Sequence, residues 1–190
     1  MGLGDVLFGR KKLKSANLDR LFALSTARIT LEAELGLKPD DVAAVVFKPL
    51  SAGEFMQAER DLDELLGVAA SDSGSKVSRR SDSFGFQWIV IRDRDFEDLV
   101  TTTHLVSSEL QARGFGGQLL AATFKFRGRD DPVYLIYGYK TATFWPFVPT
   151  GKEQERDNPE EMRLKNELEK ELPIEPDLTK WLGLFDAPLD

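Results

Sequence analysis

The chain of 190 residues contains no cysteine. This absence excludes disulfide bonds, thiolate metal sites and cysteine nucleophiles, and it agrees with a reducing cytoplasm. The sequence also has no apolar run near the ~20 residues that a membrane-spanning helix requires. Its start, MGLGDVLFGRKKLK, lacks the pattern of charge, apolar stretch and cleavage site that marks a signal peptide. We therefore expect a cytoplasmic protein without a transmembrane segment.

Basic residues are too few to balance the acidic ones. The 25 lysines and arginines stand against 32 aspartates and glutamates, which gives a formal charge of −7. An acidic chain is not attracted to phosphate backbones, so we expect no nucleic-acid partner. Hydrophobic residues make up 42% of the chain and charged residues 30%, a balance typical of a globular domain with a real core.

Residues that carry out catalysis are also scarce. His104 is the single histidine, so a zinc site would need carboxylate ligands and a Ser-His-Asp triad would have to form around this residue. It lies one helical turn from Val100 in an apolar stripe, which favours packing over catalysis. The glycines at 114, 116 and 117 follow a helix, whereas a dinucleotide loop precedes one. The sequence therefore predicts no catalytic residue, no metal ligand and no cofactor.

The residues that are present predict an α+β fold. Val42–Phe47 forms an apolar run, and Phe84, Phe86, Trp88 and Val90 alternate with other residues as in a strand with a buried aromatic face. Residues 69–83 read as a loop or hairpin tip. A helix capped by Asp93 or Asp95 ends at Gly114, and strands follow at 119–126 and 133–139. We expect a mostly antiparallel sheet of hairpins with helices packed on one face, and a hairpin–helix–hairpin core over 75–139.

Further helices are predicted on either side of this core. Asn17 is placed to cap a helix over 18–24, and an amphipathic pattern covers 53–66. Asn158, followed by Pro159 and Glu161, predicts the start of another helix. The proline-containing extension over 174–190 is too apolar for a free tail, so it should pack on the domain or on a partner. We expect a flexible segment at 1–16 and a single α+β domain at 17–190.

The amino-terminal segment combines apolar and basic residues. These are Leu3, Leu7, Phe8, Arg10, Lys11, Lys12 and Lys14. Such a pattern is suited to an amphipathic segment on an anionic membrane surface, which would place the protein peripherally on the inner face of the membrane. The alternative is a solvated chain end.

An aromatic and proline-rich segment over 143–149 is the predicted surface for binding a protein partner. We select Phe144, Trp145 and Phe147, together with Trp181, because aromatic residues are enriched in binding hot spots. Trp145, Pro146 and Phe147 are expected to be its exposed part. Core packing is the alternative for the same residues.

Several phrases of the sequence resemble those of one bacterial and archaeal family. They are NLDRLFAL at 17–24, FGFQW at 84–88, GFG at 114–116, TFWPFVP at 143–149, RDN at 156–158 and LPIEPDL at 172–178, followed by Trp181. In this order they resemble the PspA-associated protein PspAB family over residues 2–188. The resemblance implies an accessory factor of PspA, a coiled-coil phage-shock protein that assembles on the inner face of a stressed membrane.

The sequence therefore leads to a non-enzymatic binding protein of the envelope-stress response. A chaperone-like protein-binding module that forms a homodimer is the first alternative. The hairpin–helix–hairpin order is similar to that of type III secretion chaperones, which is an analogy of fold alone. A hydrolase that depends on carboxylates or on His104 is the less favoured alternative.

Overall fold

The computed structural model describes residues 17–48, 64, 67 and 74–189. Its elements are η1 (Asp19–Phe22), α1 (Ala23–Ala33), β1 (Lys38–Phe47), β2 (Lys76–Ser81), β3 (Gln87–Arg92), α3 (Phe96–Ala112), η2 (Phe115–Gly117), β4 (Leu119–Arg127), β5 (Pro132–Gly138), β6 (Thr143–Phe147), α4 (Asn158–Leu168) and η3 (Leu178–Lys180). The membrane-surface residues predicted at 3–14 lie outside the described residues. So does the helix predicted at 53–66, except for Glu64.

The six strands form one sheet in the order β2-β3-β1-β4-β5-β6. Every neighbouring pair is antiparallel. The hairpins β2–β3 and β4–β5 lie on either side of α3 in the sequence, so the predicted α+β class and the hairpin–helix–hairpin core are confirmed. β1 lies between the hairpins, and its apolar run 42–47 is buried on both faces, as expected for a central strand.

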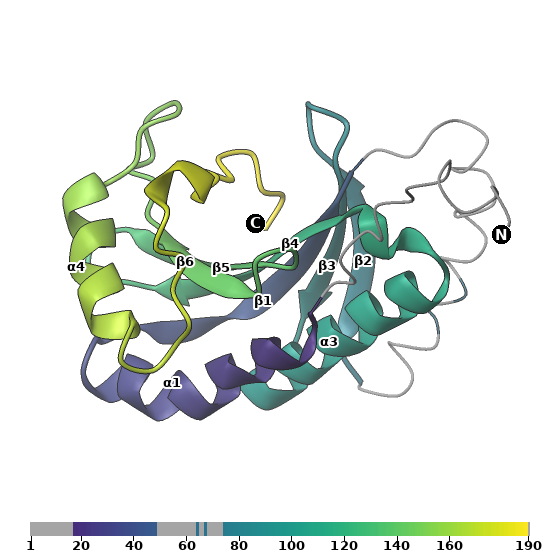
Figure 1. Ribbon diagram of the computed structural model, residues 1–190, viewed down its shortest axis with the longest axis horizontal. Coiled ribbons are helices and arrows are strands. Elements are labelled where there is room, and N and C mark those ends of the chain that lie inside the picture. Colours follow the sequence, from purple (N-terminus) through teal and green to yellow (C-terminus); the bar gives the residue numbers. More distant parts are fainter. Residues whose placement is uncertain (1–16, 49–63, 65–66, 68–73, 190) are drawn as a thin grey trace, which may run out of the picture.

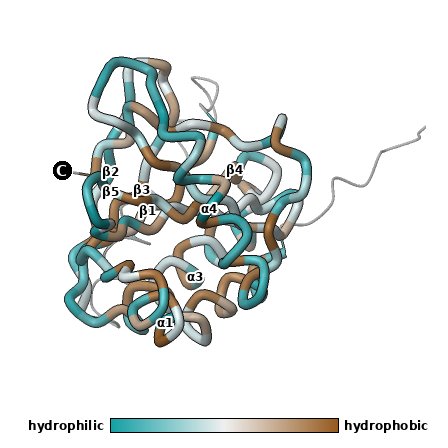
Figure 2. The backbone as a smooth tube through the Cα atoms, turned by 90° about the vertical axis from the view of Figure 1, so that its left-hand side faces the viewer, coloured by the Kyte–Doolittle hydropathy of each residue, from teal (hydrophilic) through white to brown (hydrophobic). Residues whose placement is uncertain are grey.

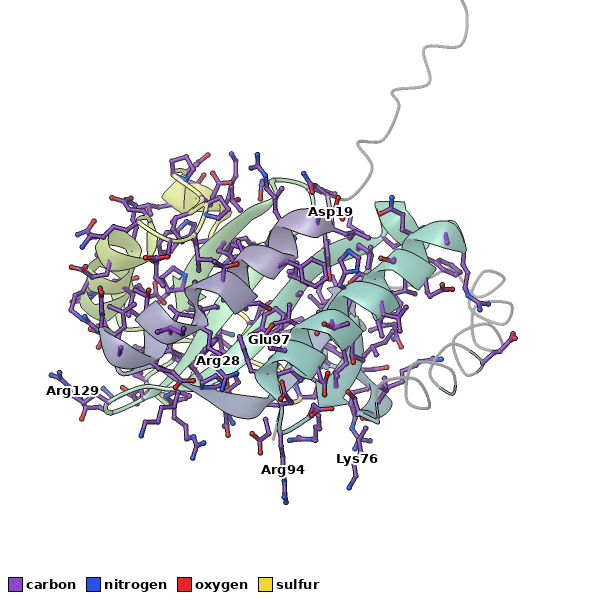
Figure 3. The ribbon with its side chains drawn as sticks, turned by 90° about the horizontal axis from the view of Figure 1, so that it is seen from below. Asp19, Arg28, Lys76, Arg94, Glu97 and Arg129 are labelled. Atoms are coloured by element: carbon purple, nitrogen blue, oxygen red, sulfur yellow. The ribbon has the colours of Figure 1, made fainter. Side chains whose placement is uncertain are left out.

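The two faces of the sheet are covered by different kinds of structure. α1 and α3 lie across one face, while the chain that follows α4 crosses the other face (Figure 1). The view in Figure 2 shows both helices on the same side of the strands. Figure 3 looks onto this helical side, where Arg28 of α1 and Glu97 of α3 lie close to each other. We call the two surfaces the helix face and the strap face of the sheet.

α3 begins and ends where the sequence predicts. The Asp95 carboxylate accepts hydrogen bonds from the backbone amides of Glu97, at 2.8 Å, and Asp98, at 3.4 Å. Gly114 has a left-handed conformation with φ 92°, which glycine adopts without strain. Among the described helices, none combines the length and apolar character needed to cross a bilayer.

Three predictions about loops and helix caps are wrong. Residues 76–81, expected in a loop or hairpin tip, form strand β2. Asn17 does not cap a helix: its backbone amide donates to Tyr139 and its carbonyl accepts from the Tyr137 hydroxyl. The cap of α4 is Asp157, whose carboxylate accepts from the Glu160 amide at 2.9 Å, and not Asn158.

Candidate partner-binding site

A row of residues on the strap face forms the floor of the candidate site. Trp88 pairs with Val46 across β3 and β1, Val46 pairs with Ala121 of β4, and Ala121 pairs with Gly138 of β5. Along this row the side chains become smaller, from Trp88 to Gly138. The Trp145 ring of β6 packs so closely on Gly138 that a Cβ there would lie 2.9 Å from it. A hollow remains above Ala121, between the two indoles.

A β-bulge shapes one wall of this hollow. The pairing between β1 and β4 shifts by one residue between Leu119 and Ala121. As a result Leu120 and Ala121 both contribute to the strap face, whereas Leu119 belongs to the core under the helices. A bulge adds one residue to one strand and re-aims its side chain, here Leu120 toward the hollow.

The carboxy-terminal segment 173–189, which we call the strap, closes the hollow from above. It joins the edge of β6 through hydrogen bonds from the Phe144 amide to Pro173 and from the Glu175 amide to Phe144. Further along, the Trp145 indole donates to the Leu182 carbonyl at 3.1 Å, and the Trp181 indole donates to the Glu175 carbonyl at 3.0 Å. Packing on the domain or on a partner was predicted for this segment, and the structure shows packing on the domain.

Between strap and sheet lies an apolar cavity of about 280 Å³, which we call the strap pocket. It is lined by Val46, Asp82, Phe84, Phe86, Trp88, Leu120, Ala121, Ile136, Trp145, Gln154, Leu182, Gly183, Leu184, Phe185 and Asp186. The indole N–H groups of Trp88 and Trp145 are already bonded to Asp82 and Leu182. Both indoles therefore offer apolar ring surface to an occupant.

The rim of the strap pocket exposes large apolar side chains. Phe84, Leu182 and Phe185 are 67%, 56% and 38% exposed. Phe84 was predicted to belong to a buried aromatic face, but it precedes β3 in the β2–β3 turn and so extends into solvent. A cluster of exposed apolar side chains around a hollow is typical of a protein-binding surface.

The four residues selected from the sequence lie on both faces of the sheet: three belong to the apolar cluster of the strap face and one to the core under the helices. Trp145 lines the strap pocket, Phe147 packs edge-on against Phe185 with centroids 5.0 Å apart, and Trp181 lies buried in the strap. Phe144 is on the opposite face, 4.7 Å from the Tyr137 ring. The expected exposure of Trp145, Pro146 and Phe147 is wrong, because β6 is a strand under the strap and Trp145 is only 4% exposed. Their role in partner binding stays a prediction.

An ion pair fixes the strap next to α4. The Arg156 guanidinium contacts both carboxylate oxygens of buried Glu161 at 2.8–2.9 Å, and the Val148 amide donates to the same carboxylate. Arg156 also donates to the Trp181 carbonyl at 3.1 Å. Burial raises the pKa of the Glu161 carboxyl, and the bonds from Arg156 and Val148 oppose that rise.

His104 has polar neighbours on the helix face. The Ser108 hydroxyl is 3.5 Å from its Nδ1, the Asp19 carboxylate is 3.5 Å from its Nε2, and the Phe22 ring packs on it at 4.7 Å. Both polar distances are long for hydrogen bonds. Asp19 is almost fully exposed, so it does not orient the imidazole from a buried position as a triad aspartate does. In the described part of the chain, no three histidine or carboxylate side chains gather to hold a metal ion.

Sequence reasoning missed most of the rim, namely Phe84, Leu182, Phe185 and the two carboxylates Asp82 and Asp186. The available signal was the apolar composition of the strap, which predicted packing but not a hollow beneath it. The hollow lies above Ala121, and Gly138, its neighbour across the β4–β5 pairing, leaves room for the Trp145 ring at its side.

The chain was compared with models of protein families. The model described as PspA associated protein B matches residues 1–189. Neither a curated protein nor a solved structure matches the chain.

Proposed function

Because this chain belongs to the PspA associated protein B family, we propose that it is a non-enzymatic accessory factor that binds a PspA-type coiled-coil protein in the membrane-stress response. The family match is the evidence for the link to PspA. The strap pocket, with its exposed apolar rim, is the evidence for the position of the binding surface.

The chemistry of the rim supports binding to a protein. Phe84, Leu182 and Phe185 keep apolar surface in contact with water, and burying it in a complex releases free energy in proportion to the area removed from water. The hollow next to them accepts a protruding side chain, which is the geometry of a binding hot spot.

A non-enzymatic role is supported by the surroundings of the one histidine. The Ser108 hydroxyl lies one turn away from His104 on the same helix, where backbone amides are engaged in the helical ladder and do not form an oxyanion hole. The hydrolase considered as the alternative would instead depend on His104 or on carboxylates for turnover. Hydrolysis of a broad ester and phosphoester panel that disappears in His104→Ala would contradict the proposal.

The partner surface is tested by titrating the purified protein with a purified PspA-type protein, with and without lipid vesicles. Phe84→Ser and Leu182→Ser remove exposed apolar side chains and should each weaken binding about tenfold or more, as expected for hot-spot residues. The matched control is Ile29→Ser, because Ile29 is 80% exposed but belongs to α1 on the helix side. Ile29→Ser should bind like the parent.

Two results would contradict this function. Absence of binding at micromolar concentrations, under both conditions, would remove the PspA link. Equal weakening by Ile29→Ser and by the rim variants would remove the strap pocket as the surface. A concentration-dependent homodimer that is lost in the rim variants, without any PspA binding, would favour the chaperone-like alternative.

We also propose a peripheral position on the inner face of the membrane, through the amino-terminal residues Leu3, Leu7, Phe8, Arg10, Lys11, Lys12 and Lys14. Replacing the four basic residues with glutamine should abolish cosedimentation with anionic vesicles, because basic residues contribute about 1 kcal/mol each near such a surface. Unchanged cosedimentation would exclude this segment as the contact.

A further inference from the structure

Two carboxylates line the strap pocket, and they come from segments that are far apart in the sequence. Asp82 belongs to the β2–β3 turn and Asp186 to the strap, and both line the cavity. A 3.4 Å hydrogen bond from the Ser83 hydroxyl to Asp186 links the turn to the strap. No lysine or arginine of the described residues is among the residues that line the cavity. The apolar hollow therefore has an acidic mouth.

The interior suits one bulky apolar group. An apolar cavity of about 150 Å³ takes a benzene ring, so the 280 Å³ of the strap pocket accommodates an aromatic or branched aliphatic side chain. The indole N–H groups of Trp88 and Trp145 are used inside the protein. A polar head group would consequently find few free partners inside the hollow.

Building on the protein-binding function proposed above, we propose that the strap pocket holds one aromatic or branched aliphatic side chain of a partner segment in which lysine or arginine residues flank that side chain. The apolar group fills the space above Ala121. The flanking cations lie near Asp82 and Asp186, where opposite charge favours them. An acidic peptide or a fatty acid carboxylate would meet like charge at the same mouth.

Tryptophan fluorescence gives a direct reading of this site. The chain has three tryptophans, and all three belong to the apolar cluster of the strap face. Three end-blocked peptides serve as probes for the full-length protein: KKLFKK, KKSSKK without apolar residues, and EELFEE with reversed charge. KKLFKK should change the emission and bind at least tenfold more tightly than either of the other two.

Two variants separate the hollow from its charged mouth. Ala121→Leu fills the hollow from its floor and should abolish binding of KKLFKK, while the melting temperature shows that the protein stays folded. Asp186→Lys should weaken KKLFKK about two- to fivefold, the range of an exposed ion pair, and should strengthen EELFEE. Asp130→Lys is the control with the same change in net charge, because Asp130 is exposed in the β4–β5 turn and does not line the pocket.

The results of these experiments test the strap pocket separately from the PspA-type partner. Binding of KKLFKK without binding of a PspA-type protein supports the site and contradicts only the partner named above. Binding of a PspA-type protein that survives Ala121→Leu overturns the site. Equal binding of EELFEE, or tighter binding of dodecanoate, overturns the chemistry of the occupant. A rise in KKLFKK affinity in Leu7→Ser, Phe8→Ser would identify the chain's own amino-terminal segment as the occupant and overturn its assignment to a partner.

Discussion

At the scale of single residues, Glu161 is a buried carboxylate that is paired with an arginine. It is 1% exposed, and Arg156 neutralises it through contacts at 2.8–2.9 Å. Removing one partner of a buried ion pair typically costs 3–5 kcal/mol, because the other charge stays buried without compensation. Arg156→Ala should therefore lower the free energy of unfolding by about 3 kcal/mol at pH 8, as measured by urea unfolding.

The effect of Arg156→Ala should depend on pH. Burial already raises the pKa of the Glu161 carboxyl, and loss of the guanidinium raises it further. A group whose pKa is higher in the folded state stabilises that state at low pH and loses this contribution as the pH rises. The cost should thus be smaller at pH 5 than at pH 8. The control is Arg163→Ala, whose exposed pair with Glu160 is worth about 0–1 kcal/mol; similar losses in both variants would contradict this account.

The buried phenol of Tyr137 should make the free energy of unfolding depend on pH in the alkaline range. Burial raises its pKa to about 12, and its hydroxyl donates to the Asn17 carbonyl at 2.6 Å. The folded state therefore holds the phenol proton above pH 10, where the unfolded chain releases it, and stability falls as the pH rises from 10 through 12. Tyr137→Phe should cost about 1 kcal/mol at pH 8 for the lost hydrogen bond.

The same variant should lose less stability between pH 9 and pH 11 than the parent protein does. Tyr139→Phe offers a comparison, because burial raises the pKa of Tyr139 as well and its hydroxyl bonds to Ser107. Ser107 also donates to the Thr103 carbonyl, so it keeps a partner in that variant. An alkaline loss in Tyr137→Phe as steep as that of the parent would show that Tyr137 does not carry this dependence.

At the scale of elements, two neighbouring residues at the start of α4, Asp157 and Asn158, have different roles. The Asp157 carboxylate accepts from the Glu160 amide, while Asn158 is the first residue of the helix. Replacing a capping aspartate with alanine typically costs ~1 kcal/mol. Asp157→Ala should show this loss in urea unfolding, and Asn158→Ala should cost less than about 0.5 kcal/mol. A larger loss of stability in Asn158→Ala than in Asp157→Ala would show that Asn158 is the cap, as the sequence predicted.

Elements with a strong local pattern were predictable from the sequence, and elements held by pairing were not. α3 has an apolar stripe and a capping aspartate, so its limits were predicted closely. β2 carries Ser78, Arg79 and Arg80, and its strand conformation follows from its pairing with β3, which local composition does not encode. β6 contains Pro146, which an edge strand tolerates since fewer of its amides need partners.

The strap pocket was beyond local prediction for a related reason. Its hollow depends on the small side chain of Ala121, on Gly138 across the strand pair, which leaves room for the Trp145 ring, and on the bulge that turns Leu120 toward the same space. Neither residue type predicts a cavity by itself. The strap closes the hollow from a position more than 40 residues further along the chain, so only the folded topology brings floor, wall and cover together.

At the scale of the whole molecule, the two faces of the sheet are covered in different ways. The helix face packs α1 and α3 on a continuous core, and β1 is hydrogen-bonded on both sides. The strap lies outside the six-stranded sheet, attached to the edge of β6 and through side-chain bonds from Trp145 and Arg156. Segments with fewer such contacts open locally at a lower free energy than the rest of the protein.

We therefore expect the strap to open while the sheet stays folded, which would also admit a side chain to the strap pocket. Native-state hydrogen exchange by NMR can test this, because the Trp145 indole proton is bonded to the Leu182 carbonyl of the strap. Its exchange should be faster than that of the Val45 amide in β1 and nearly independent of low urea concentrations, since a local opening exposes little surface. Exchange at Val45 should rise with urea as global unfolding does. If both protons show the same protection and urea dependence, the strap and the sheet unfold as one unit, and entry to the strap pocket does not proceed by local opening.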